Sequence, residues 1–267
     1  MRTARSISSP SICSPHQLNS SSWVPSDRSD PLTGILLAAL IAAVWLASLL
    51  VALQQPLQQM GLAELMGLVL IRTLSQTGLF IIAHDAMHGS LLPALPRWNC
   101  RIGAVALLLY AGLSFRRCQR NHLSHHRHSE TAADPDYHRP GQPQIHLWYG
   151  AFMGRYLSAW QLLRLGLIWL GVTAAASMTH PLAGVNVVSF CIIPLVLSSL
   201  QLFVVGTWLP HRCASPAEVA VTPRSLPMHP VVSLAACYHF GYHFEHHKFP
   251  YTPWFRLPLM RDCNNSV

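Results

Sequence analysis

Histidines gather in three short strings of this 267-residue chain, which contains 16 histidines in all. The strings are His-Asp-Ala-Met-His at 84–88, His-Leu-Ser-His-His at 122–126 and His-Phe-Glu-His-His at 243–247. On a helix, positions i, i+3 and i+4 share one face, so each string can present its imidazoles together. Histidine is the commonest metal ligand in proteins. The strings therefore supply eight candidate metal ligands: His84, His88, His122, His125, His126, His243, His246 and His247.

A ninth candidate, His211, stands alone in Gly-Thr-Trp-Leu-Pro-His at 206–211. A single histidine pair on an exposed helix is weak evidence, but core packing explains three such strings poorly, because buried imidazole nitrogens need partners. Eight or nine ligands exceed the four that a single zinc ion normally takes, so the count predicts two metal ions. Imidazole suits iron, copper, nickel and zinc alike, so ligand chemistry alone leaves the metal open.

Three carboxylates lie beside the strings: Asp85, Asp136 and Glu245. A carboxylate in such a place can accept a hydrogen bond from the free N–H of a ligand and fix its tautomer. His239, four residues before the third string, is a candidate for the same supporting role or for a further ligand. The alternatives for the acids are ordinary solvation and loop capping, since Asp-Pro-Asp at 134–136 is also a turn signal.

The elements that must position these side chains are membrane helices. The chain is 51% hydrophobic and only 10% charged, whereas a soluble domain carries about 25% charged residues. About 20 apolar residues span a bilayer as a helix, and four stretches approach or exceed that length: 35–53, 65–83, 157–178 and 185–209. Segment 102–115 is too short to cross and predicts a re-entrant or interfacial helix, and 231–238 predicts a buried or interfacial turn.

This pattern predicts an all-α integral membrane protein with four transmembrane helices and a histidine-rich cap. One domain is expected over residues 34–258. It is flanked by a disordered Ser/Pro-rich tail at 1–33 and by a C-terminal tail at 259–267.

Basic residues predict the topology. The chain has 18 Lys and Arg against 10 acids. In a soluble protein this excess would suggest nucleic acid as a partner, but cytoplasmic flanks of membrane helices collect the same residues, so no nucleic acid is expected. With a cytoplasmic N-terminus, the far turns at 54–61 and 180–184 contain no Lys or Arg. Both termini and all three histidine strings then lie on the cytoplasmic side.

Arg72 and Arg164 are the two basic residues within the predicted spans. A charge inside the membrane is costly and usually faces the protein interior or a wet cavity. Glu64 precedes Arg72 by eight residues, which is longer than the usual i, i+4 contact. The sequence offers no firm account of Arg72.

Four strings of sequence resemble one family closely. They are GLFIIAHDAMHG (78–89), NHLSHHRHSETAADPDYH (121–138), LFVVGTWLPHR (202–212) and CYHFGYHFEHHKFPYTPWFRLP (237–258). They are similar to the bacterial-type β-carotene 4-ketolases, within the superfamily of membrane fatty-acid desaturases and hydroxylases. The similarity covers roughly residues 34–258, and Arg72 departs from the uncharged residue expected there.

The resemblance implies a non-haem di-iron oxygenase that uses O₂ and two electrons per cycle. Its substrate would be an apolar carotenoid in the lipid bilayer. Two oxidations at C4 of a β-ionone ring would convert β-carotene through echinenone to canthaxanthin, with electrons from a ferredoxin-type donor. By position, the eight histidines of the three strings match the family's metal ligands, and His211 matches an additional one.

Other functions remain open at this stage. A β-carotene 3-hydroxylase or a fatty-acyl desaturase would carry similar histidine strings. A metal transporter is the alternative of another class, but ion pathways place polar groups inside the spans, whereas all nine candidate ligands lie outside the spans or at their ends. A zinc protease is disfavoured because the first string lacks the HExxH glutamate.

Overall fold

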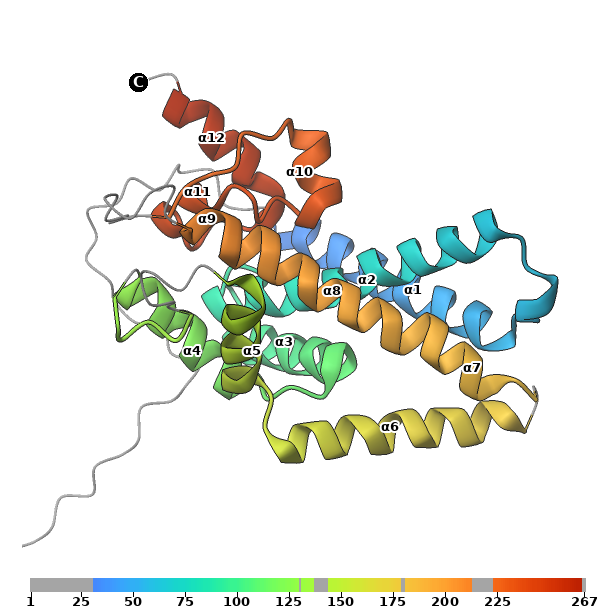
Figure 1. The fold of residues 1–267 in the computed structure, drawn as a ribbon. Helices are drawn as coiled ribbons and strands as arrows, with labels where there is room; N and C mark the ends of the chain where they lie inside the picture. The colour runs from blue at the N-terminus through green and yellow to red at the C-terminus, as the bar shows by residue number, and fades with distance from the viewer. Residues whose placement is uncertain (1–30, 130, 137–143, 179–180, 213–222, 266–267) are drawn as a thin grey trace, which may run out of the picture.

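The computed structural model describes residues 31–129, 131–136, 144–178, 181–212 and 223–265, and every regular element in these ranges is helical. Figure 1 shows their arrangement. The α-helices are α1 (Pro31–Gln54), α2 (Leu62–His88), α3 (Pro96–Ala111), α4 (Phe115–His128), α5 (Ile145–Tyr156), α6 (Ala159–Ser177), α7 (Ala183–Val187), α8 (Ile193–Phe203), α9 (Leu209–His211), α10 (Pro230–Cys237), α11 (His243–Lys248) and α12 (Leu257–Asn265). Short elements η1 (Leu57–Gln59) and η4 (Trp254–Arg256) are 3₁₀ turns, whereas η2 (Val188–Ile192) and η3 (Val204–Trp208) are π-helical.

Four helical segments of the described chain are long and apolar enough to cross a membrane: α1, α2, α6 and the continuous rod from α7 to α9. The predicted fold class, an all-α membrane protein with four spans, is thereby confirmed. Large apolar side chains remain exposed on α6, as at Trp160 and Leu170, which suits a surface that faces lipid tails.

The two predicted tails differ from the structure at their edges. Most of the tail predicted at 1–33 lies outside the described residues, but α1 already begins at Pro31, because proline is well tolerated in a first helical turn. The tail predicted at 259–267 is helical as far as Asn265, in α12.

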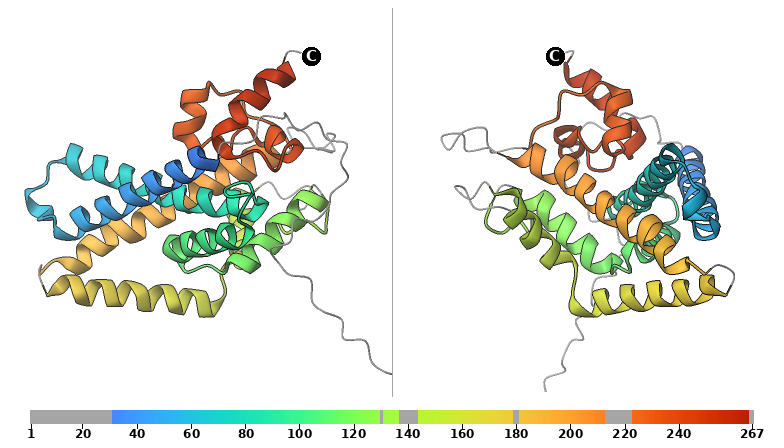
Figure 2. Two further views of the ribbon diagram at one scale, coloured as in Figure 1. Left: turned by 180° about the vertical axis from the view of Figure 1, so that it is seen from behind. Right: turned by 45° about the vertical axis from the view of Figure 1, so that its right-hand side comes forward.

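The spans turn back at one end of the molecule and meet the remaining helices at the other. In Figures 1 and 2, the α1–α2 turn and the α6–α7 turn lie at one end, while α4, α9, α11 and α12 gather at the opposite end. Helix α2 reaches this second end because it has 27 residues. It is therefore about 40 Å long, roughly 10 Å more than the hydrocarbon core of a bilayer. Its last turns carry the first histidine string.

The short apolar segment predicted at 102–115 is part of a bent helix pair. Helix α3 ends at Ala111 and is followed by Gly112, which has a positive φ of 64°, and α4 continues at an angle of 100°. This geometry agrees with the prediction of a re-entrant or interfacial helix. Gly103 lets α3 approach α2 closely, because a Cβ at this position would lie 2.6 Å from the Cβ of Ala86. The bend carries the second histidine string, on α4, back toward the end of α2.

The fourth span contains two π-helical segments that the hydropathy pattern does not reveal. In η2 the N–H of Ile193 donates to the carbonyl of Val188, and in η3 the N–H of Leu209 donates to the carbonyl of Val204. Such segments appear frequently at functional sites. The second one ends three residues before His211.

Arg72 is fully buried between α1, α2 and the fourth span. Its guanidinium donates hydrogen bonds to the carbonyl of Phe190 (2.9 Å), within η2, and to the carbonyl of Trp45 (2.8 Å). It also lies over the Trp45 ring, 5.3 Å from the centroid. Glu64 instead accepts from its own helix start, the N–H of Gly61 (2.9 Å). Backbone carbonyls and an aromatic face therefore stabilise the charge that the sequence left unexplained.

Candidate metal centre

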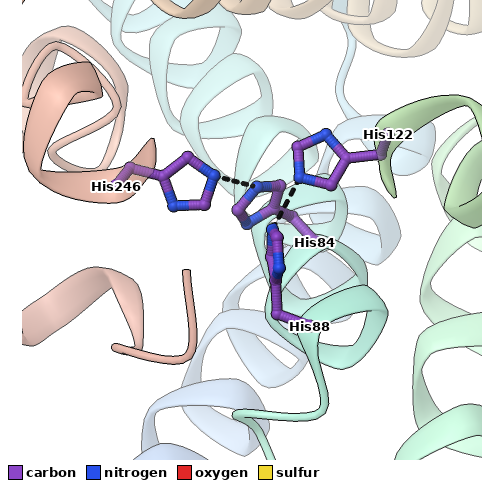
Figure 3. Close-up of side chains that lie close together, drawn as sticks. All are labelled: His84, His88, His122 and His246. Carbon is purple, nitrogen blue, oxygen red and sulfur yellow. Dashed lines mark hydrogen bonds between the residues drawn. The ribbon is translucent and has the colours of Figure 1, made fainter. Parts of the chain in front are cut away.

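The first histidine cluster joins the end of α2 to α4 and α11. It consists of His84, His88, His122 and His246, whose nearest ring nitrogens all lie within 4.8 Å of one another. Figure 3 shows the four rings pointing toward a common centre. The Nε2 atoms of His84 and His246 are 3.2 Å apart, and those of His88 and His122 are 2.7 Å apart.

The second cluster joins α4 and α11 to α9. It consists of His125, His211, His243 and His247, again with one nitrogen from each within 4.8 Å of the others. The Nε2 atoms of His211 and His243 are 2.8 Å apart, and those of His125 and His247 are 3.1 Å apart. The solitary histidine of the sequence thus meets partners from two of the three strings.

His126 lies next to the first cluster. Its Nε2 is 2.9 Å from the Nε2 of His246 and 3.2 Å from that of His122, and its ring stacks on His247 of the second cluster at 4.2 Å between centroids. All nine histidines singled out in the sequence are therefore brought together at one end of the spans.

Local helical geometry explains how so few elements position so many rings. Helix α4 presents His122, His125 and His126 on one face at spacings of three and four. The six-residue helix α11 does the same with His243, His246 and His247. Residues at positions i and i+3 point in slightly different directions from a helix. Each of the two helices therefore contributes histidines to both clusters.

The donor chemistry fits bound metal ions. A neutral imidazole has one N–H and one lone pair, and here the Nε2 atoms converge instead of meeting other acceptors or donors. The Nδ1 atoms of His84 and His243 are buried and have no hydrogen-bond partner among the described residues. Burial first, and then the neighbouring imidazoles, hold the pKa of His243, His246 and His247 well below the ordinary value. The rings are therefore neutral at pH 7, the form that binds metal.

Asp134 is the supporting carboxylate that sequence reasoning missed. Both of its oxygens lie 2.9 Å from Nδ1 of His125, and the side chain is buried. The carboxylate accepts the Nδ1–H and leaves the Nε2 lone pair of His125 aimed into the second cluster. The Asp-Pro-Asp turn signal at 134–136 was visible in the sequence, but it marked a loop and not a histidine partner.

Asp136 lies further from the His125 ring than Asp134 does. Its Oδ2 is 4.0 Å from Nδ1 of His125, too far for a hydrogen bond, and its Oδ1 accepts from the hydroxyl of Tyr156 (2.9 Å). Its backbone N–H donates to Asp134 (2.8 Å). Burial raises the pKa of Asp136 above its ordinary value, and burial followed by the nearby Asp136 carboxylate raises the pKa of Tyr156. Tyr156 was not singled out in the sequence.

The other supporting candidates contact the rings less directly. Asp85 lies 3.6 Å from Nδ1 of His84 and accepts from the backbone N–H of Trp254 (3.3 Å). Glu245 is buried and accepts a hydrogen bond from the hydroxyl of Ser225. His239 belongs to neither cluster; its ring stacks on Tyr242, 5.6 Å between centroids. Its backbone has a positive φ of 65°, which turns the chain between α10 and α11.

A cavity of about 430 Å³ opens beside the clusters. His84, His122, His125 and His243 contribute to its wall, together with Asp136. The remaining wall is mostly apolar and comes from α2, α3, α5, α6 and α8; it includes Phe80, Tyr110, Phe152, Trp169 and Leu195. The shape suits an apolar molecule whose end lies against the histidines.

The spans, the paired clusters and the cavity define a multi-pass membrane protein that binds metal through histidine next to an apolar chamber. The comparison with known families agrees with this class. The model of the fatty acid desaturase family matches residues 60–263, so the chain belongs to this family.

Named relatives lie among the ketolases. The chain is 40% identical over 243 residues to a protein of Paracoccus sp. strain N81106 named β-carotene ketolase, covering 88% of this chain and 95% of the relative. A β-carotene ketolase of Paracoccus sp. strain PC1 is also 40% identical, over 245 residues, with 89% and 96% covered. A zeaxanthin 4-ketolase of Chlamydomonas reinhardtii is 38% identical over 192 residues, which are 69% of this chain and 41% of that protein. No solved structure matches the chain.

Proposed function

We propose that this protein is a carotenoid ketolase of the membrane: it converts the C4 methylene of a β-ionone ring to a ketone, taking β-carotene through echinenone to canthaxanthin. The observation that carries the proposal is the position of the histidine clusters, which line one part of an otherwise apolar cavity. The relatives named as ketolases support this substrate, and their identity extends over nearly the whole chain.

Two iron ions are the cofactor that we propose for this chemistry. His84, His88, His122 and His246 would hold one ion, and His125, His211, His243 and His247 would hold the other, with His126 beside the first. When bound, the iron pair would supply the activation of O₂ that is needed to break an unactivated C–H bond. Imidazole accepts several metals, so the choice of iron rests on the reaction.

The protein's own side chains prepare the site for this reaction. Asp134 keeps the tautomer and orientation of His125. The phenyl and indole rings of the cavity exclude water and hold the ring and polyene of the substrate. Each oxidation places one oxygen atom of O₂ on C4 and converts the other to water with two electrons and two protons. The second oxidation gives a geminal diol, which loses water to form the ketone.

The electrons come, in this proposal, from an acidic ferredoxin-type donor on the cytoplasmic side. Arg116, Arg120 and Arg127 are exposed on α4, and their helical spacing places them within about 40° of one another. They lie opposite the face that carries the histidines. None of the three forms an ion pair with a described residue. This arginine stripe is complementary to an acidic partner and lies one helix diameter from the metal ligands.

The topology follows from the same charges. The arginine stripe, both clusters and the last helices lie at one end of the spans, away from the two lysine- and arginine-free turns. The positive-inside rule supports our proposal that this end, with both termini, is cytoplasmic.

Expression in cells that make β-carotene tests the function. We expect echinenone and canthaxanthin to accumulate, the purified protein to hold about two iron atoms per chain, and a His246→Ala variant to form no ketone while it remains in the membrane. Extracts with only 3-hydroxylated carotenoids would favour a hydroxylase, desaturated lipids without oxidised carotenoid would favour a desaturase, and one bound zinc without iron would contradict the proposed cofactor.

A further inference from the structure

Thr207 lies in the π-helical segment η3, one turn before His211, and its side chain is 8% exposed. It lines the cavity together with Gly206 and with His243, the neighbour of His211 in the second cluster. A Cβ at Gly206 would lie 3.2 Å from the ring of Phe240, so the segment is packed closely and the position of Thr207 is fixed. The threonine thus borders the part of the cavity where the substrate would meet the histidines.

The hydroxyl of Thr207 lacks the partner that a helical threonine usually has. In α2, Thr73 donates to the carbonyl of Val69 (2.8 Å) and Thr77 to the carbonyl of Thr73 (3.0 Å), four residues earlier in each case. The Thr207 hydroxyl forms no hydrogen bond with any described residue.

Other hydroxyl groups of the cavity wall are already engaged. Tyr149 and Ser199 share a hydrogen bond of 2.6 Å, and the hydroxyl of Tyr156 donates to Asp136 (2.9 Å). Tyr110 accepts from the hydroxyl of Ser198 (3.5 Å). The Thr207 hydroxyl is not among the enclosed polar atoms that lack a partner, so it is open to the cavity that Thr207 lines, where a bound molecule can reach it. Among the cavity hydroxyls of the described chain, Thr207 is the one with both donor and acceptor available.

We propose that Thr207 binds the oxygen that the first oxidation places on C4 and so selects the ketone over the alcohol. This inference rests on the proposed function and names a positioning residue for it. β-Carotene has no polar atom, so the hydroxyl of Thr207 forms no hydrogen bond with it. After the first oxidation, C4 carries a hydroxyl group, and a hydrogen bond to Thr207 holds that oxygen aside and leaves the remaining C4–H directed at the metal ions.

Substitution by valine removes the hydroxyl and keeps the shape. In cells that make β-carotene, we expect Thr207→Val to retain the first oxidation but to lower the ratio of 4-keto to 4-hydroxy product about fivefold, the effect of losing one hydrogen bond. Thr207→Ser should restore the ratio. Thr173→Val, on α6 and outside the cavity wall, is the matched control and should leave the ratio unchanged.

A binding measurement separates positioning from a structural effect. Without O₂ the full-length, iron-loaded protein does not turn over, so quenching of its tryptophan fluorescence in detergent reports carotenoid affinity alone. Thr207→Val should weaken the Kd for 4-hydroxy-β-carotene about fivefold and leave the Kd for β-carotene unchanged.

Three results would overturn the inference: an unchanged product ratio in Thr207→Val, an equal loss of affinity for both carotenoids, or loss of bound iron. The proposed function fails separately. If the wild-type protein forms no 4-oxidised carotenoid at all, the function itself is wrong; if it forms ketone with the same ratio in the valine variant, only the role of Thr207 is wrong.

Discussion

The carboxylate of Asp134 shows how much one buried side chain contributes to the metal centre. Both oxygens face the same imidazole nitrogen of His125 at 2.9 Å, and a third hydrogen bond, from the backbone N–H of Asp136, fixes the carboxylate itself. The ring of His125 therefore has one tautomer and one orientation before any metal binds. Such outer partners are worth about 10- to 100-fold in metal affinity.

Replacing this carboxylate tests its role at the level of a single residue. We expect Asp134→Asn to lower iron affinity about 10- to 100-fold, measured as iron retained during titration with a chelator. Glu245→Gln is the matched control, because Glu245 is a buried carboxylate within the third string that accepts a hydrogen bond from Ser225 instead of from a histidine ring. Equal iron retention in the two variants would contradict the assignment to Asp134.

Sequence spacing predicted the histidines well and their partners poorly. The three strings follow helical periodicity, so their rings were expected to share faces, and they do. Asp134 lies nine residues from His125 across a turn, a separation that no periodicity constrains. Glu245 lies between His243 and His246 in the sequence. Its position on the helix places its side chain on the other side of α11, where it accepts a hydrogen bond from Ser225.

At the scale of elements, the contact between α2 and α3 sets the position of the first string. Gly103 on α3 faces Ala86, which lies between His84 and His88 on α2. A Cβ at residue 103 would approach the ring of Phe115 to 2.4 Å, closer than real contacts allow. Because Phe115 begins α4, this single glycine permits two histidine-bearing helices to meet.

Adding one methyl group here should therefore disturb both stability and the metal site. We expect Gly103→Ala to destabilise the protein by about 1–3 kcal/mol, the usual cost of overpacking, and to lower its iron content. Thermal unfolding in detergent measures the first effect and metal analysis the second. Gly150→Ala on α5, with nothing within 4 Å of the new Cβ, should leave the iron content unchanged and raise the Tm slightly, because alanine is about 1 kcal/mol more favourable than glycine inside a helix; a similar Tm for the two variants would argue against the close contact.

Hydropathy predicted where the membrane spans lie, but not the π-helical segments or the bend between α3 and α4. The four spans were predicted from apolar length, and the structure has four candidate spans. The π-helical segments η2 and η3 are equally apolar and leave no mark on hydropathy. The 100° bend between α3 and α4 follows from Gly112 and from packing against α2, which a count of apolar residues cannot show.

At the scale of the whole molecule, charge and metal ligands share one end of the helical bundle. The arginine stripe on α4 lies on the outer face of a helix whose inner face holds His122, His125 and His126. An acidic electron donor that docked there, as proposed above, would come near the metal ligands without entering the membrane. Electrostatic docking of this kind weakens as salt screens the charges.

Reversing the charge of the arginine stripe should impair electron transfer from the protein donor and leave the oxidation of the substrate unaffected. We expect Arg120→Glu combined with Arg116→Glu to raise the KM for a reduced ferredoxin several-fold and to flatten its dependence on salt. Turnover with dithionite as reductant should be unchanged. Arg97→Glu, an exposed arginine on α3 away from the stripe, is the control for charge alone, and an equal rise in KM there would contradict the docking site.

The burial of Arg72 has a consequence for how the chain is made. Its carbonyl partners come from Trp45, which is synthesised before it, and from Phe190, which emerges 118 residues later. Until the last span enters the bilayer, a cation in the second span lacks part of its solvation shell, and that span is held in the membrane at a cost in free energy. A chain that ends before residue 190 would therefore place Arg72 in the lipid without its hydrogen bond to Phe190.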